Sequence, residues 1–195
     1  MAIFNSQTAP LARRCSQMEG EDGFTLIELL VVLLIIGILL AIAIPTFLSV
    51  TRGANNTASQ DNLQTALTGA KVYYTDGGLT YANLMVATAG ASDIQQIDTG
   101  LSFTSTVAST GARLISVYTP ANGSYIILTA LANGTNECWG IVDMPTVQTV
   151  PVQQQTGPST LFFVERNQTA NCNASTYKAG GTQATATSQT GFPPA

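Results

Sequence analysis

One carboxylate stands inside the most apolar stretch of this 195-residue chain. Residues 24–44 contain Glu28 as their one charged residue, and the polar, acidic residues 19–23 precede them. As a helix, this stretch would be about 31 Å long at about 1.5 Å per residue, close to the bilayer hydrocarbon thickness of about 30 Å. An ionised carboxylate near a bilayer centre costs about 2.5–3.5 kcal/mol and usually marks a partner. We therefore expect a membrane-spanning helix in which Glu28 has a specific role.

Other residues that could do chemistry give weaker signals. The chain has no His, which argues against a zinc or copper centre and against His-based acid–base catalysis. The pairs Asp93/Asp98 and Glu137/Asp143 lack the dense oxygen-ligand spacing of a calcium loop, so solvated surface is the favoured interpretation. The Lys and Arg residues are scattered and form no basic patch for nucleic acid. The sequence predicts neither an enzyme nor a cofactor.

Three Cys residues lie on two sides of the apolar stretch. Cys15 precedes it, whereas Cys138 and Cys172 follow it. A membrane-spanning helix would place the last two together on the far side. If that side is oxidising, they can pair and leave no orphan thiol there. Two unpaired buried thiols are the alternative, and we favour the disulfide.

Two ordinary explanations of the apolar stretch are unsatisfactory. A cleaved secretory signal has an apolar region of about 7–15 residues. This stretch is longer, although Ala41-Ile42-Ala43 imitates a cleavage site, and its nearest charged flank is acidic. A plain signal anchor explains the length but gives no reason for Glu28, unless that carboxylate simply sits solvated at headgroup level.

The string Gly23-Phe24-Thr25-Leu26-Ile27-Glu28 followed by a long apolar stretch resembles the class III signal sequence of the type IV pilin family. The resemblance implies that a prepilin peptidase cuts between Gly23 and Phe24 on the cytoplasmic side. The same enzyme type then N-methylates Phe24, and the apolar stretch is retained. In staggered copies, Glu28 of one subunit would pair with the Phe24 amine of its neighbour and so fix the axial register.

The resemblance also implies a division of the chain and a set of partners. Residues 1–23 would be the cleaved leader, 24–45 the transmembrane and filament-core half of a helix, 46–76 its amphipathic half, and 77–195 a globular head domain. Gly37 and Pro45 match positions where the family often has helix-loosening residues. Expected partners are other pilin subunits, the peptidase and methyltransferase, the pilus assembly platform and, before assembly, the cytoplasmic membrane.

The periodicity of the remaining chain predicts an α+β fold. Leu63, Ala66, Leu67, Ala70 and Tyr74 recur at helical spacing, and Asp76-Gly77-Gly78 is a helix stop. A short helix is expected near Ile94. Strands are predicted at residues 101–108, 113–118, 125–131, 137–142 and 161–166. Asn122-Gly123 and Asn133-Gly134 are hairpin signals. We expect an antiparallel sheet of four or five strands packed on the amphipathic half-helix, and a loosely ordered tail from Gly180 to Ala195.

Taken together, these features favour a structural pilin subunit, first anchored in the inner membrane and then part of an extracellular type IV pilus. Alternatives are a pseudopilin of a type II secretion system, a minor pilin or a monomeric membrane-anchored binding domain. Tyr73, Tyr74 and Tyr81 are expected to pack the helix on the head domain. Asn-x-Ser/Thr sequons occur at Asn55, Asn122, Asn133, Asn167 and Asn173, and chance alone produces several in so Asn- and Thr-rich a chain.

Overall fold

The computed structural model describes residues 23–85, 94–97, 99–146, 149–150, 155–156, 158–168, 172–178, 186–188 and 190–193. Residues 1–22, including Cys15, and the acidic pair Asp93 and Asp98 lie outside the described residues. The chain forms two compact units, Met1–Ile44 and Pro45–Ala195.

A single long helix, α1 (Leu26–Asp76), occupies the amino-terminal part of the described chain. Its end confirms the predicted stop. Gly78 adopts a left-handed conformation (φ 84°), and the Leu79 N–H donates to the Tyr74 carbonyl at 2.9 Å. This is the helix-ending arrangement that glycine permits without steric cost.

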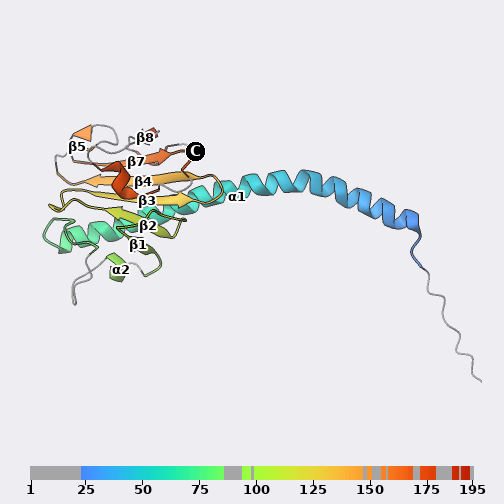
Figure 1. The fold of residues 1–195 in the computed structure, drawn as a ribbon, viewed down its shortest axis with the longest axis horizontal. Helices are drawn as coiled ribbons and strands as arrows, with labels where there is room; N and C mark the ends of the chain where they lie inside the picture. Colours follow the sequence, from blue (N-terminus) through green and yellow to red (C-terminus); the bar gives the residue numbers. More distant parts are fainter. Residues whose placement is uncertain are drawn as a thin grey trace, which may run out of the picture. The chain divides into compact units, whose positions relative to one another are not determined.

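The head domain is built on one mixed sheet (Figure 1). The further elements, in chain order, are α2 (Ile94–Ile97), β1 (Ser102–Thr104), β2 (Leu114–Tyr118), β3 (Ile126–Ala132), β4 (Glu137–Met144), β5 (Thr149–Val150), β6 (Gln155–Thr156), β7 (Ser159–Glu165), η1 (Ala174–Tyr177) and β8 (Ala186–Ser188). The six-stranded sheet has the order β1-β2-β3-β4-β7-β8, and β5 pairs with β6 separately. The predicted α+β class and the short helix at Ile94 are confirmed.

The sheet differs from the expectation in two respects. It has six strands, and β1 runs parallel to β2, with Ser102 opposite Leu114, so the sheet is not purely antiparallel. The antiparallel hairpins β2–β3 and β3–β4 are those that contain the Asn-Gly signals, with Gly123 at φ 63° and Gly134 at φ 93°. No such turn lies between β1 and β2, so the sequence did not specify their relative direction there.

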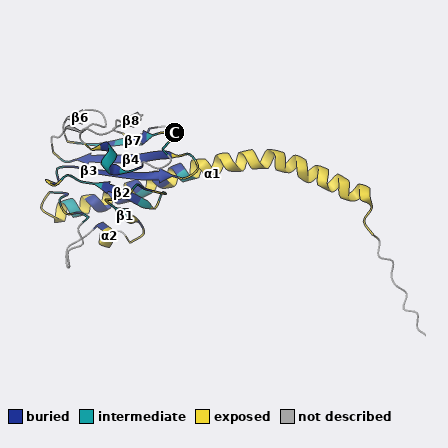
Figure 2. Ribbon diagram, viewed as in Figure 1, coloured by how far each residue is buried: buried dark blue, intermediate teal, exposed yellow. Residues whose placement is uncertain are grey.

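One face of the sheet packs on the second half of α1. The helix buries Leu63, Ala66, Leu67 and Ala70 on that side, as predicted from their spacing. Opposite them, the sheet contributes buried side chains that alternate along its strands: Ile115, Val117, Ile126, Leu128, Ala130, Trp139, Ile141 and Val164. Figure 2 shows the buried residues concentrated in β2, β3, β4 and this part of the helix.

The other face of the sheet is covered by the carboxy-terminal region. Cys138 on β4 is bonded to Cys172, which lies just before η1. The Cys172 carbonyl accepts a hydrogen bond from the Ser109 N–H at 2.7 Å, and the ring of Phe163 lies against Tyr177. Because both faces are covered, every residue of β3 and β4 is buried. The predicted disulfide is confirmed.

The expected loose tail is wrong for its described residues. Strand β8 pairs with β7 at the edge of the sheet, with Thr187 opposite Phe163. Beyond it, Phe192 packs edge-on against Trp139 and Phe162, at ring-centroid distances of 5.7 and 5.0 Å. The polar composition of this segment gave no sign that Phe192 would pack on the sheet. Burying its ring removes a large apolar area from water and so stabilises this part of the tail.

Candidate processing and assembly site

Residues 23–28 form an exposed helix start. Gly23 and Phe24 precede α1, and the Phe24 side chain is 87% exposed. Oε2 of Glu28 accepts hydrogen bonds from the Thr25 N–H at 2.9 Å and the Thr25 hydroxyl at 2.7 Å. The Glu28 N–H in turn donates to the Thr25 hydroxyl oxygen at 3.3 Å. This reciprocal arrangement is a capping box, in which the first turn of a helix satisfies its own donors.

The capping box is a role for Glu28 that the sequence-based interpretation missed. Its signature, Thr followed three residues later by Glu at the start of an apolar stretch, is present in the sequence. The box occupies only one carboxylate oxygen. Among the described residues, Oε1 of Glu28 accepts no hydrogen bond, so this oxygen is available to a donor from outside the subunit.

Every residue from 23 to 54 is exposed, including the whole apolar stretch (Figure 2). Its most apolar 18-residue window has a mean hydropathy of 3.2, and none of it is buried. By length and composition, α1 is the one helix among the described residues that could cross a membrane. A surface of this kind is unstable in water and must be covered by lipid or by protein.

Gly37 and Pro45 both lie inside α1, and the helix continues through them. No atom lies near the position that a Cβ on Gly37 would occupy, so its lack of a side chain is not required by packing within the subunit. Pro45 removes one intrahelical hydrogen bond, which loosens the helix locally. Pro45 is also the first residue of the second compact unit.

A buried amide fixes the start of the amphipathic half-helix on the sheet. The Asn56 amide donates to Oε2 of Glu137 at 2.7 Å, and its Oδ1 accepts from the Thr135 hydroxyl at 2.7 Å. Arg166 lies 3.6 Å from the other carboxylate oxygen of Glu137. A buried polar group without partners costs about 1–3 kcal/mol, so this network favours one position of the helix along the sheet.

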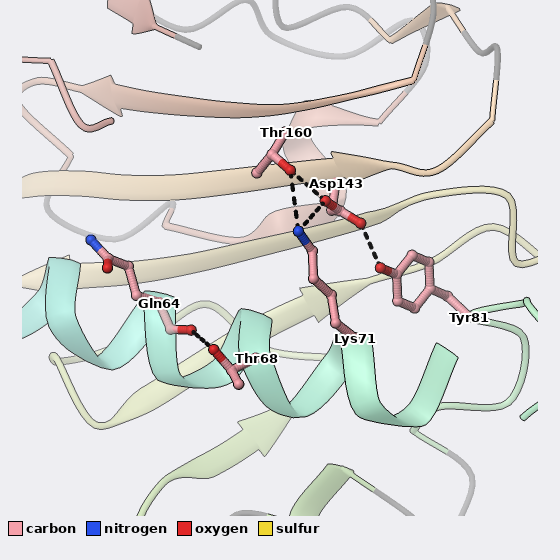
Figure 3. A network of polar contacts seen from close by, with 6 residues as sticks. All are labelled: Gln64, Thr68, Lys71, Tyr81, Asp143 and Thr160. Carbon is pink, nitrogen blue, oxygen red and sulfur yellow. Dashed lines mark hydrogen bonds and ion pairs between the residues drawn. The ribbon is translucent and has the colours of Figure 1, made fainter. Parts of the chain in front are cut away.

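A second polar network fixes the other end of the helix (Figure 3). Lys71 Nζ on α1 lies 3.2 Å from Oδ1 of Asp143 on β4, which also accepts from the Thr160 hydroxyl on β7. The Tyr81 hydroxyl donates to Oδ2 of Asp143 at 2.6 Å. Burial raises the pKa of the Tyr81 phenol, and the hydrogen bond to Asp143 raises this pKa further.

The expectation that Glu137 and Asp143 form solvated surface is therefore wrong. Both residues are buried, with relative exposures of 8% and 6%, and each is bonded to side chains of α1. The described residues contain no group of three or more His, Cys, Asp or Glu side chains that could hold a metal ion.

The predicted role of the three tyrosines is confirmed. Tyr81 is fully buried, and its ring lies 4.8 Å from that of Tyr74 between centroids. The Tyr73 hydroxyl donates to the Ala82 carbonyl at 2.8 Å. All three rings therefore hold the end of α1 against the head domain.

Comparison with known proteins identifies the amino-terminal segment. Residues 19–44 match the family described as the prokaryotic N-terminal methylation motif. The segment is a prepilin methylation motif. This finding confirms the resemblance to the class III signal of type IV pilins, because the motif contains Gly23, Phe24 and Glu28 in the order that the resemblance requires.

Two relatives are similar to this chain over a longer stretch than the motif. The chain is 43% identical over 54 residues to the type IV major pilin protein PilA of Myxococcus xanthus, and 39% identical over 66 residues to the type IV wide pilus major component PilA4 of Thermus thermophilus. These matches cover 28% and 34% of this chain, and 24% and 50% of the relatives. The chain thus spans half or less of the length of these relatives. No solved structure matches.

Proposed function

We propose that this chain is a prepilin whose mature form, residues 24–195, is a structural subunit of a type IV pilus. A prepilin peptidase cuts between Gly23 and Phe24, and the new amino terminus of Phe24 is N-methylated. The observation that carries the proposal is that the apolar stretch within the matched methylation motif, residues 19–44, is an entirely exposed helix in the described residues. Both named relatives are major components of type IV pili.

The apolar half of α1 has two successive environments in this proposal. Before assembly it anchors the subunit in the cytoplasmic membrane, with the head domain on the outer side. In the filament the same residues pack against the helices of other subunits. Fully burying one Leu or Ile side chain stabilises it by about 1.5–3 kcal/mol relative to exposure to water. A long exposed apolar helix is therefore covered either by membrane lipid or by the helices of other subunits.

Glu28 sets the register between subunits. After cleavage, the Phe24 amine of a neighbouring subunit binds the free Oε1 of Glu28, while Thr25 continues to hold Oε2. A subunit at the wrong axial position would bury a carboxylate without a cationic partner, which costs several kcal/mol. Gly37 and Pro45 let the helix bend between Glu28 and the head domain, because glycine lacks a side chain and Pro45 removes a backbone hydrogen bond.

Replacing the carboxylate tests this register. We expect Glu28→Ala and the isosteric Glu28→Gln to insert in the membrane and to be cut after Gly23, because the apolar stretch and the cleavage site are unchanged. Both variants should give at least tenfold less sheared surface filament than the wild type. Glu28→Asp keeps the charge and should retain part of the yield. Normal filament yield from Glu28→Gln would refute the register role.

The alternatives within the same architecture make different predictions about abundance. A major pilin dominates sheared surface filaments, whereas a minor pilin or a type II secretion pseudopilin is scarce in them. The naming of both relatives as major components favours the first. Motility, adhesion or DNA uptake would be properties of the assembled filament and its assembly platform.

A further inference from the structure

We propose that Asn122 is the acceptor of an N-linked saccharide. The sequence contains five Asn-x-Ser/Thr sequons. A sequon can be an acceptor only if its Asn amide and its hydroxyl are both accessible to a transferase. The structure separates these sequons by what their side chains already do. The modification needs only that the head domain be exported, so it does not depend on polymerisation.

Asn122 is exposed in a tight turn between β2 and β3, in which Gly123 is buried and Ser124 is half-buried. The Gly123 N–H donates to the Pro120 carbonyl at 2.8 Å, and Gly123 has a φ of 63°. Oδ1 of Asn122 accepts from both the N–H and the hydroxyl of Ser124, at 3.2 and 2.9 Å. The sequon hydroxyl is thus already bonded to the acceptor amide. Among the described residues, Nδ2 of Asn122 makes no hydrogen bond, so the nucleophilic nitrogen is free.

Two other sequons are committed to the fold. Asn55 lies within α1 and donates its Nδ2 to the Asn133 carbonyl. In the Asn133 sequon, the Thr135 hydroxyl is half-buried and bonded to Oδ1 of Asn56, a member of the network that fixes the helix. A transferase could reach these groups only by breaking hydrogen bonds that hold α1 on the sheet.

The Asn173 sequon has the same local pairing as the Asn122 sequon, but its amide is less accessible. Oδ1 of Asn173 accepts from the Ser175 N–H and hydroxyl at 3.0 and 2.9 Å as the cap of η1, and also from the Ser116 hydroxyl at 3.4 Å, and Asn173 is half-buried. Its neighbour Cys172 is held in the disulfide. Asn167 is exposed, but the Thr that completes its sequon lies outside the described residues. Among the sequons that lie wholly within the described residues, Asn122 is therefore the one with an exposed acceptor Asn and a hydroxyl that is not bonded to the polar network of α1.

The surface beside Asn122 suits an attached sugar. A hollow of about 410 Å³ adjoins the turn. Its lining includes Asn83, Ser105, Tyr118, Thr119, Pro120 and Ala121, none of them a charged side chain. Amide and hydroxyl groups exchange hydrogen bonds with sugar hydroxyls, and an aromatic ring can pack against the apolar face of a sugar. Because Pro120 and Ala121 belong to both the turn and the hollow, the first sugar units would lie over it.

The transfer step requires a saccharide linked through phosphate to a membrane polyprenol, and a transferase outside the cytoplasm. Nδ2 of Asn122 attacks the anomeric carbon of the saccharide. The C–N bond forms as the C–O bond to the polyprenyl phosphate breaks, and the amide proton leaves to a base of the transferase. No oxidation or reduction takes place.

Mass spectrometry of the protein isolated from its own cells tests this assignment. Cleavage after Tyr118 and Tyr125 releases residues 119–125, which contain Asn122 and no other sequon. We expect this peptide to carry one or more sugar residues on Asn122. Asn122→Gln and Ser124→Ala should each lose the added mass, because the first removes the nucleophile and the second removes the hydroxyl.

Two control variants keep the test specific. Ser124→Thr retains a sequon and should retain the sugar, and Asn133→Gln should leave the mass of the 119–125 peptide unchanged. An unmodified peptide, a deamidated Asn122 without sugar, or a glycan found on Asn167 instead would overturn the assignment. Because the readout is the mass of one peptide, failure to assemble filaments does not affect it.

Discussion

Within a single subunit, the Glu28 carboxylate already accepts two hydrogen bonds from Thr25 at the start of α1. The capping box with Thr25 uses Oε2 and leaves Oε1 without a hydrogen bond among the described residues, as the proposed pairing with a neighbouring Phe24 amine requires. A carboxylate that is already oriented loses less conformational freedom when its partner arrives. The charge of Glu28 and the string around it predict its importance, whereas its geometry depends on the local Thr25-x-x-Glu28 capping pattern.

Asn56 illustrates what residue types alone cannot reveal. It lies in a helical turn that looks weak in the sequence, because Gly53 and two Asn residues have low helix propensity. Its partners Thr135 and Glu137 follow about 80 positions later in the chain, with separations of 79 and 81 residues. No local periodicity encodes such a contact, so only the folded structure can show it.

The buried phenol of Tyr81 predicts a loss of stability at alkaline pH. Burial and the hydrogen bond to Asp143 raise its pKa, so the folded state favours the protonated phenol. This contribution is complete below the unfolded-state pKa of about 10 and is lost as the pH rises above it. Burial and the Glu165 charge raise the pKa of Tyr177 in the same direction. Each phenol should contribute a slope of about 1.4 kcal/mol per pH unit above about pH 10.

Urea unfolding of the full chain in detergent between about pH 8 and pH 11 would measure this slope. Tyr81→Phe removes one titrating group, so its unfolding free energy should fall less steeply with pH than that of the wild type. Tyr177→Phe should behave in the same way, and the double variant should be flatter still. A Tyr81→Phe curve that runs parallel to the wild-type curve would contradict the buried phenol as the source.

At the scale of elements, β4 and β7 fit together through one glycine. Gly140 is the cross-strand partner of Phe163, a fully buried residue. A Cβ on Gly140 would clash with the Cζ and both Cε atoms of the Phe163 ring. The ring therefore occupies the space above the glycine backbone, between the sheet and the carboxy-terminal region that includes Tyr177.

Gly140→Ala should destabilise the head domain by about 1–3 kcal/mol, the usual cost of overpacking a core. Phe163→Leu in the same chain should relieve part of this cost, because it removes the clashing ring atoms. A double-mutant cycle measured by urea unfolding checks the coupling between Gly140 and Phe163. Gly37→Ala is a suitable control because the surroundings of Gly37 are open, whereas Gly191 has a positive φ that would strain an alanine. If the two changes at Gly140 and Phe163 prove additive, the packing account is incorrect.

Most elements of the head domain could be predicted because their signals are local. The stop at Gly77-Gly78, the two Asn-Gly hairpins and the alternating strands each depend on a few neighbouring residues. The parallel pairing of β1 and the docking of β8 depend on contacts between distant segments. Strand β8 is placed by its pairing with β7, and Phe192 packs against the rings of Trp139 and Phe162, neither of which a window of polar residues indicates.

At the scale of the whole molecule, the two compact units have opposite requirements. The head domain buries its own apolar residues on both faces of the sheet, and its disulfide stabilises it by roughly 3–5 kcal/mol on the chain-entropy model. The apolar half of α1 buries none. A subunit of this kind is stable only when lipid or other copies cover that helix, and in the proposed filament other copies cover it.

The mature amino terminus of this protein in sheared surface filaments tests the central claim most directly. Mass spectrometry should find this chain as the dominant filament component, beginning at Phe24 and carrying one methyl group on its amine. That result requires cleavage, methylation, retention of the apolar helix and polymerisation together. A chain that retains its leader, or one that begins after Ala43, would contradict the account, because neither would have the Phe24 amine beside an intact apolar helix.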